Sequence, residues 1–291
     1  MNEVPALFFE QIASLVVRVE MLSSGSALSG LLGLVTSEFY EKKCRQEMIL
    51  NNGELITESY VNCGNQLVIK TPSSKHVHYR VIFICAFRGE YNTDPEAMER
   101  VLSATKGKHV LLCLKTSDIS EEIAKCVKSI RLVFELHVDT KITSDVLKLM
   151  RSCVEQNTLN KLLVGGDVEI EDETTQLLVD LLKQKQLHEI YLRSKCSAAL
   201  KQIIASWREN SEEMVGKMIY CKEGFSELQL LPEFRFEECS EEEKRDAKRA
   251  YYIPSYWPYV TAKSVLSNGD GSAVYCLSMG CCPYETHFVF A

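Results

Sequence analysis

The sequence predicts an α/β fold: a short strand-helix solenoid between an N-terminal helical segment and a C-terminal β-hairpin cap. An apolar template, L-x-x-L-x-L, recurs at a nearly constant spacing of roughly 27 residues. An amphipathic helix pattern separates each copy of the template from the next. Such units bury their inner sides only by stacking on a neighbour, which favours a solenoid over a doubly wound sheet, the alternative with the same periodicity.

Composition places the chain among globular proteins. Its 291 residues, 46% hydrophobic and 25% charged, can bury one large core or two modest ones. The net charge of -7 and the pI near 5.5 argue against nucleic-acid binding, since that affinity comes from clustered Lys and Arg. We therefore expect protein partners and no nucleic acid.

The N-terminal apolar stretch and the cysteines indicate the compartment. The stretch from Leu7 to Leu22 is interrupted by Glu10, Arg18 and Glu20, and no basic segment precedes it, so it predicts neither a signal peptide nor a membrane span. The twelve cysteines are mostly scattered singly through apolar runs, as expected for reduced thiols in a core. These features predict an intracellular protein with no membrane association, in the cytoplasm or alternatively the nucleus.

Residues 1–50 predict a helical segment, and residues 51–78 a hairpin or linker. In the first segment, apolar residues recur at three- and four-residue steps from Phe8 to Val19 and again from Leu28 to Phe39. In the second segment, short alternating runs lie among Asn, Gly, Pro and Ser turn signals.

Residues 79–232 predict the strand-helix repeat domain. Around the template copies, the pattern predicts strands at 81–87 and 110–114 and helices at 94–102, 146–154, 177–182 and 200–207. The template residues should be buried; they are Val133, Leu136 and Val138; Leu159, Leu162 and Val164; Leu187, Ile190 and Leu192; and Val215, Met218 and Tyr220.

Residues between the template positions should point to the opposite, concave side of the strands. One row of them alternates in charge, so that neighbours attract when the strands stack in register: Glu135, Lys161, Glu189 and Lys217. With an apolar middle, this surface has the mixture that a protein-binding face needs, and a sheet side covered by the chain's own C-terminal segment is the alternative. The predicted binding residues are Glu135, His137, Asp139, Lys161, Leu163, Glu189, Tyr191, Arg193, Lys217 and Ile219.

The C-terminal segment, residues 233–291, begins with a charged helix. Ser240 and Glu243 form a capping-box signature, and Glu241 with Arg245 forms an i, i+4 pair on the helix that follows.

An aromatic knot and a hairpin come next in the C-terminal segment. The knot is the stretch 251–259, which is rich in Tyr, Trp and Pro. Two alternating strands then flank Asn268-Gly269-Asp270-Gly271, a strong hairpin signal. The hairpin and the strand over 288–290 should cap the open end of the repeat sheet, because an exposed edge invites aggregation.

Catalytic signatures are weak along the whole chain. Gly165-Gly166-Asp167 occupies the position of a phosphate loop, but the acidic residues within 167–172 would repel an anion. His76 and His78 share a strand face without a carboxylate or thiol pattern to join them, and the adjacent Cys281-Cys282 lacks a regular Cys or His spacing. We therefore predict no enzyme activity, no cofactor and no metal.

The opening Val4-Pro5-Ala6-Leu7-Phe8-Phe9-Glu10-Gln11-Ile12 resembles the start of an F-box. The whole layout, a helical N-terminus followed by leucine-rich-repeat-like units, resembles the F-box-like proteins expanded in nematodes. The box lacks its closing Trp and the repeats lack the Asn of standard leucine-rich units, so the chain resembles a degenerate member. The resemblance implies docking on a Skp-type adaptor of cullin-RING ubiquitin ligases, with adaptor-facing or core residues Pro5, Phe8, Ile12, Leu15, Leu28 and Leu32.

These observations predict a non-catalytic protein-protein interaction module, and the resemblance implies a substrate receptor of a cullin-RING ubiquitin ligase. A ligand-binding or enzymatic doubly wound domain is one alternative, with a pocket at the strand ends near Asp139, Gly165 and Arg193. A structural scaffold that binds through the aromatic knot is another. Strands in chain order would indicate a solenoid, whereas a reversal from a central strand would indicate the doubly wound sheet.

Overall fold

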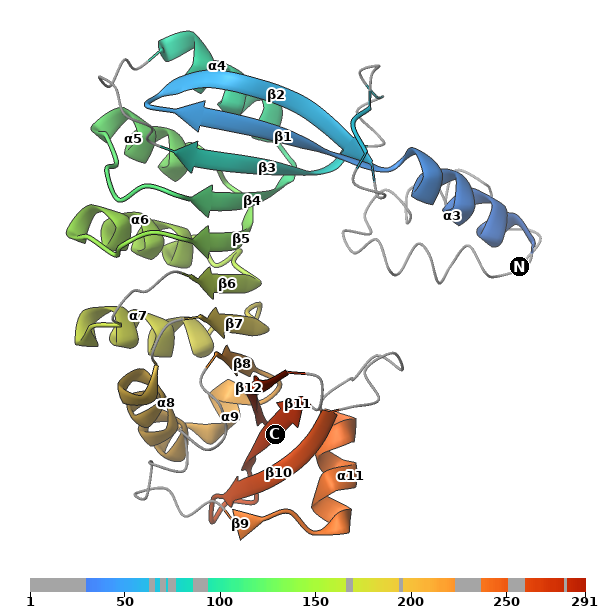
Figure 1. The fold of residues 1–291 in the computed structure, drawn as a ribbon, viewed down its shortest axis with the longest axis vertical. Coiled ribbons are helices and arrows are strands. Elements are labelled where there is room, and N and C mark those ends of the chain that lie inside the picture. The colour runs from blue at the N-terminus through green and yellow to red at the C-terminus, as the bar shows by residue number, and fades with distance from the viewer. Residues whose placement is uncertain are drawn as a thin grey trace. The chain divides into compact units, whose positions relative to one another are not determined.

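The computed structural model describes residues 30–62, 66–68, 72, 77–85, 94–165, 170–193, 196–222, 237–250, 260–279 and 282–291. The protein has a mixed α/β fold (Figure 1). The chain divides into two compact units, residues 1–134 and 135–291. The division falls inside the segment 79–232, which the sequence presents as one repeat domain. Among the described residues, we find no helix with the length and apolar character that crossing a membrane requires.

The first unit is built around a mixed sheet. Strand β1 pairs antiparallel with β2 and parallel with β3, and β3 pairs parallel with β4. The described elements are α3 (Gly30–Lys42), β1 (Cys44–Asn51), β2 (Glu54–Asn62), β3 (Val77–Cys85), α4 (Pro95–Thr105), β4 (His109–Leu114) and α5 (Glu121–Ser129). The strands predicted at 81–87 and 110–114 and the helix predicted at 94–102 are therefore confirmed, with shifted ends.

The predicted hairpin exists but starts earlier than the boundary at residue 51. Helix α3 ends at Lys42, so the last part of the segment predicted as helical, residues 1–50, is a strand instead. Strand β1 alternates between buried and half-buried residues along its length, the period of a strand covered on one side. Asn52 and Gly53 turn the chain with φ angles of 51° and 90°, which two-residue hairpins favour.

The second unit contains the repeat and the C-terminal segment. Its described elements are β5 (Val133–Val138), which begins in the last residues of the first unit, α6 (Ser144–Glu155), β6 (Lys161–Val164), α7 (Asp172–Leu182), β7 (Glu189–Leu192), α8 (Ser197–Glu209), α9 (Ser211–Met214), β8 (Met218–Cys221), β9 (Glu237–Glu238), α11 (Glu241–Ala250), β10 (Val260–Ser267), β11 (Ala273–Met279) and β12 (Cys282–Phe290).

Strands β5, β6, β7 and β8 are parallel and lie side by side in chain order. Helices α6, α7 and α8 follow them on one side, and each helix contacts the next (Figure 1). The order of these strands has no reversal, so they do not form the topological switch point at which doubly wound sheets bind ligands.

The core of the second unit lies between the parallel strands and these helices. Helix α8 places Trp207, which is 0% exposed, with its ring centroid 6.3 Å from that of Phe290 on β12. The template residues of the first strands are at most 1% exposed, as predicted: Leu136, Val138, Leu162, Val164, Ile190 and Leu192. Burial of this apolar side against the helices is the main stabilising contribution in such a unit.

The template prediction is wrong by one residue at β8. Ile190 pairs with Ile219 and Leu192 with Cys221, so Ile219 and Cys221 face the helices. Val215, which the template predicts to be buried, is 52% exposed. The physical reason is the extra helical turn α9 between α8 and β8, which lengthens this connection and shifts the strand.

Side-chain amides join each strand-helix repeat to the next one, at the turns between helix and strand. Asn160 Nδ2 donates to the carbonyl oxygen of Gln186 at 2.9 Å, and Gln184 Nε2 donates to the carbonyl oxygen of Val154 at 2.9 Å. The bond from Asn160 gives the Gln186 carbonyl a partner in the preceding repeat. The Val154 carbonyl also accepts the backbone N–H of Asn157 at 3.1 Å, so the bond from Gln184 is a second one that joins it to the next repeat. The stacking is therefore held by polar contacts as well as by the apolar core.

The C-terminal hairpin caps the parallel strands, as predicted. Strand β10 pairs antiparallel with β11, β11 with β12, and β12 with β8, where Phe288 lies opposite Ile219. Helix α11 packs on the side of β10–β12 opposite to Trp207, in a buried cluster of Cys239, Ala247, Val265, Tyr275, Leu277 and Val289. The edge of β8 that faces away from β7 is therefore paired with β12 of the same chain.

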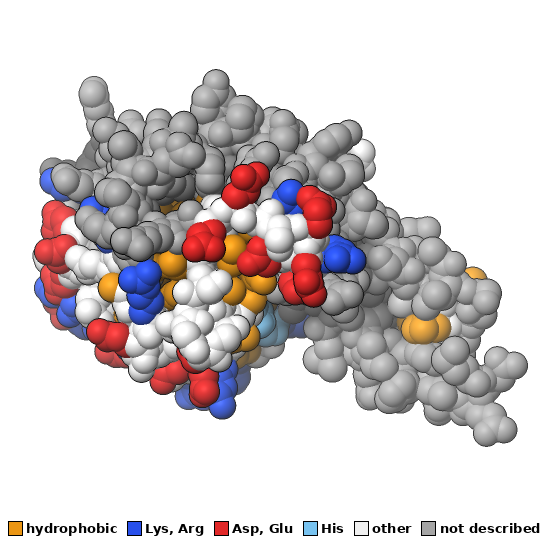
Figure 2. Space-filling view, turned by 90° about the horizontal axis from the view of Figure 1, so that it is seen from below, with side chains coloured by type: hydrophobic (Ala, Val, Ile, Leu, Met, Phe, Trp, Pro, Cys, Tyr) orange, Lys and Arg blue, Asp and Glu red, His pale blue; other side chains and the backbone are white. Residues whose placement is uncertain are grey.

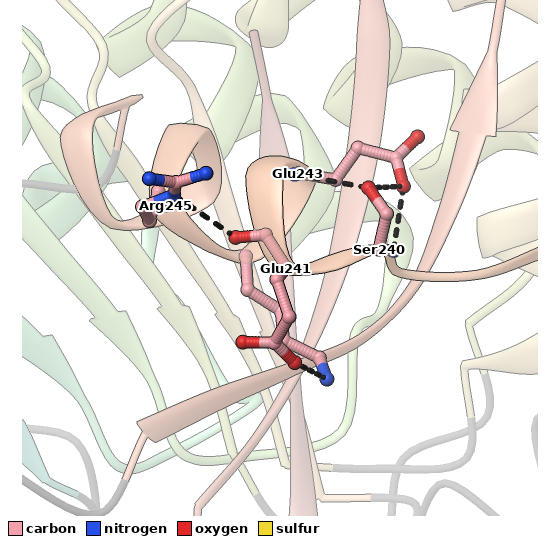
Figure 3. Close-up of polar contacts among 5 residues, drawn as sticks. Ser240, Glu241, Glu243 and Arg245 are labelled. Carbon is pink, nitrogen blue, oxygen red and sulfur yellow. Dashed lines mark hydrogen bonds and ion pairs between the residues drawn. The ribbon is translucent and has the colours of Figure 1, made fainter.

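The capping box of α11 is present (Figure 3). The backbone N–H of Ser240 donates to Glu243 Oε2 at 2.7 Å, and the N–H of Glu243 donates to Ser240 Oγ at 3.3 Å. The predicted ion pair between Glu241 and Arg245 is wrong. Arg245 Nε donates to the backbone carbonyl of Glu241 at 3.3 Å, whereas the Glu241 carboxylate pairs with Lys244 Nζ at 2.7 Å.

Candidate functional site

The candidate site is the front face, defined here as the side of β5–β8 opposite to α6, α7 and α8. Because side chains alternate along a strand, the register arranges this face in three rows that cross the strands. The third row extends the strands by one residue each, through backbone hydrogen bonds of 2.7–3.0 Å to the preceding strands. The rows are Glu135, Lys161, Glu189 and Met218; His137, Leu163, Tyr191 and Tyr220; and Asp139, Gly165, Arg193 and Lys222.

Two predicted binding residues do not belong to this face. The shifted register of β8 places Met218 and Tyr220 there in place of Lys217 and Ile219. Ile219 is 0% exposed on the helix side.

Lys217 is a buried structural residue and not a surface charge. It is 4% exposed, and its Nζ donates to the backbone carbonyls of Gln184 at 2.7 Å, Lys185 at 3.2 Å and Leu187 at 2.7 Å. Removal from water lowers its pKa below the ordinary value. The carbonyls belong to the turn after α7, so Lys217 joins β8 to the preceding strand-helix repeat.

The first row carries paired charges. Lys161 Nζ lies 3.5 Å from Glu189 Oε2, so the predicted attraction between these neighbouring strands is confirmed. On β5, His137 Nε2 of the second row lies 3.4 Å from Glu135 Oε2, a contact that is an ion pair only when the imidazole is protonated. These four side chains keep between 20% and 27% of their exposure. They form a half-buried polar band along one edge of the front face.

The second row holds a stack of rings. The rings of Tyr191 and Tyr220 lie 3.9 Å apart and nearly parallel, at 7°. On the β6 side, Lys161 Nζ lies 4.4 Å from the centre of the Tyr191 ring; on the β12 side, His287 meets the Tyr220 ring edge-on at 4.1 Å. Each tyrosine ring therefore has one face covered by the other tyrosine. The opposite face is covered by Lys161 in Tyr191 and by His287 in Tyr220. The rings are not available to stack on a nucleobase, the usual mode of single-strand binding.

The apolar middle of the front face is less accessible than the sequence suggests. Leu163 and Tyr220 are each 9% exposed. The exposed residues belong to the third row: Asp139, Arg193 and Lys222. The groups that this face presents to solvent are therefore mainly charged. Helix α11 of the C-terminal segment packs on β10–β12. The predicted alternative, cover of the front face of β5–β8 by this segment, stays a prediction, because residues 223–236 and 251–259 lie outside the described residues.

Sequence reasoning missed His287, which completes the ring stack from β12. It is 0% exposed, and burial lowers its pKa to about 4. No local signal indicates this position, because the pairing of β12 with β8 joins segments far apart in the sequence.

The buried imidazole predicts a pH dependence of stability. Its folded pKa of about 4 lies below the ordinary histidine pKa of 6.5, so unfolding takes up a proton between these values and stability falls as the pH drops through that window. From pH 7 to pH 5 the loss from this group is about 2 kcal/mol. Urea unfolding at both pH values measures it, and most of this loss should vanish in His287→Asn. The exposed His188→Asn is the control; equal pH dependence in the wild type and His287→Asn would contradict the assignment.

No protein-family model, curated protein or solved structure matches this chain. The site therefore stands on its own geometry.

The residues that the resemblance implies for adaptor binding lie mostly outside the described residues: Pro5, Phe8, Ile12, Leu15 and Leu28. Leu32 is half-buried on α3, where its carbonyl accepts a hydrogen bond from Thr36 Oγ1 at 2.8 Å. The aromatic knot at 251–259 also lies outside the described residues, as do Gly166, Asp167, His76 and Cys281.

Nine cysteines of the described ranges are buried and form no disulfide: Cys44, Cys85, Cys113, Cys126, Cys153, Cys196, Cys221, Cys239 and Cys276. The described ranges contain no group of three or more His, Cys, Asp or Glu arranged to hold a metal ion. Burial raises the pKa of Cys126 to about 11 and that of Cys153 to about 12. Such thiols remain protonated at neutral pH and are poor nucleophiles. These two cysteines act as small apolar core residues.

Acidic side chains gather at the end of the second unit that carries α11 (Figure 2). The exposed acidic residues of β9 and α11 are Glu237, Glu238, Glu241, Glu242 and Asp246. A surface of this sign repels the phosphate backbone of nucleic acids.

Proposed function

We propose that the chain is a non-catalytic protein-binding module that uses the front face of β5–β8. The observation that carries the proposal is the register, which brings charged residues from separate sequence segments into continuous rows. The rows combine paired half-buried charges, a rigid ring stack and exposed charges at the strand ends. The exposed charges at the strand ends are the groups offered to a partner, and the ring stack holds the strands beneath them rigid.

The stacked order supports a binding surface over a ligand pocket. Consecutive parallel strands with helices on one side are the arrangement of a solenoid, and we extend the leucine-rich-repeat-like interpretation to β5–β8 on this basis. The alternative doubly wound domain has less support, because these strands have no reversal of order at which a pocket would form.

The finer proposal is that the module is a substrate receptor of a cullin-RING ubiquitin ligase. Residues 1–50 would engage a Skp-type adaptor while the front face holds the target protein. Its support is the box-like opening, from Val4 to Ile12, together with the repeat that follows.

A photo-crosslinking amino acid tests both parts in the full chain, expressed in its native cells. Placed at Glu135 or Arg193, it should form adducts with a target protein; placed at Phe8, with the Skp-type adaptor. The matched controls are the exposed helix positions Glu155 and Glu209, which should form none. Equal adducts from front-face and helix positions would contradict the binding face, and the absence of adaptor at Phe8 would contradict the ligase role alone.

A further inference from the structure

The third row of the front face contains two cations for which the part of the chain that the structure describes supplies no counterion. Arg193 and Lys222 follow β7 and β8, and the N–H of Lys222 donates to the carbonyl of Leu192 at 3.0 Å, which keeps the strands in register at this point. Their backbones therefore run about 4.8 Å apart, with both side chains on the same face. Both are exposed.

Neither cation forms an ion pair or side-chain hydrogen bond with any residue in the described ranges. This contrasts with Lys161 of the same face, which is paired with Glu189. Like charges placed side by side on neighbouring strands repel each other. An anionic group seated between Arg193 and Lys222 would remove that repulsion, and a guanidinium is well shaped to hold a carboxylate through two hydrogen bonds.

The other end of the row is acidic. Gly165 has no side chain, and a Cβ there would lie 2.8 Å from Asp139 Oδ1, so the Asp139 carboxylate leans over β6 towards the cations. Asp139 is exposed. The row therefore runs from a negative to a positive end, and its two ends are separated by about 12 Å, from β5 to the space between β7 and β8.

We infer that the occupant is an extended protein segment that crosses the strand ends, with an acidic residue over Arg193 and Lys222 and a basic residue over Asp139. A span of about 12 Å corresponds to roughly three to four residues of extended chain. Recognition depends on this charge order, because the tyrosine rings beside the row already have both faces covered. The inference rests on the proposed function and adds the chemistry of the partner.

Selection from a random dodecapeptide phage library on the immobilised full chain tests the inference. The expected peptides carry a basic residue separated by two or three positions from an acidic one. The double variant Arg193→Glu/Lys222→Glu should lose the acidic preference and select a second basic residue instead. An enriched wild-type peptide should bind this variant about tenfold or more weakly by fluorescence anisotropy.

The control variant Lys128→Glu/Arg131→Glu changes the net charge equally at exposed positions of the first unit. It should select the same peptides as the wild type. Peptides whose selection is unchanged by Arg193→Glu/Lys222→Glu but lost in Tyr191→Ala would overturn the charge-order inference and leave the binding face intact. Absence of any enriched peptide would count against both.

Discussion

Replacing Trp207 with alanine is expected to lower the free energy of unfolding by about 3–5 kcal/mol. The side chain is 0% exposed and packs between α8 and Phe290 of β12, so its removal leaves a cavity where the repeat meets the cap. Urea unfolding followed by circular dichroism measures the change, which should appear as a lower midpoint with an unaltered slope.

Two variants separate packing from other effects at this position. Trp207→Phe keeps a ring and removes an indole N–H that is buried without a hydrogen-bond partner among the described residues, so its loss should be clearly smaller. Glu209→Ala, at an exposed position of the same helix, should change stability by less than about 0.5 kcal/mol. A loss of under about 1 kcal/mol in Trp207→Ala would show that the surroundings collapse to fill the space.

Lys217→Met is expected to lower the free energy of unfolding by about 3 kcal/mol, although it replaces a buried charged residue by an apolar one of similar length. The ammonium satisfies the carbonyls of Gln184, Lys185 and Leu187, and methionine would leave them without this donor. Since hydrogen bonds to charged groups contribute more than neutral ones, the lost bonds outweigh the gain from burying an apolar chain. The same unfolding measurement gives the value.

The control for this prediction is Lys185→Met, which removes a lysine side chain that is exposed in the same turn. It should leave the midpoint of unfolding nearly unchanged. If the two variants lose equal stability, Lys217 acts only through the net charge. The proposal that it joins β8 to the preceding strand-helix repeat would then be wrong.

Most elements of the second unit were predictable because they carry a local period, which the short α9 and β9 do not. Apolar residues at three- and four-residue steps mark α8, and the copied template marks β5, β6 and β7. The capping box at Ser240 and the turn at 268–271 are equally local signals. These features depend only on residues that are close together in the sequence, so they can be predicted without the structure.

The candidate site was predicted only in part because register depends on distant segments. The single turn of α9 moved β8 by one residue and exchanged Lys217 for Met218 on the front face. A one-residue shift sends every side chain to the other side of the sheet, so a small error in spacing changes the whole fourth strand. The contact between Tyr220 and His287 requires the β8–β12 pairing, which no local pattern contains.

The antiparallel direction of β12 has a consequence for the evolution of this architecture. Strand β8 pairs in parallel with β7 and antiparallel with β12, so its two edges meet two different hydrogen-bond spacings. A strand added between β8 and β12 would have to take over that antiparallel edge, whereas a strand added among β5–β8 would meet parallel neighbours on both sides. Added repeats should therefore be accommodated most readily between β5 and β8, with the β8–β12 pairing kept.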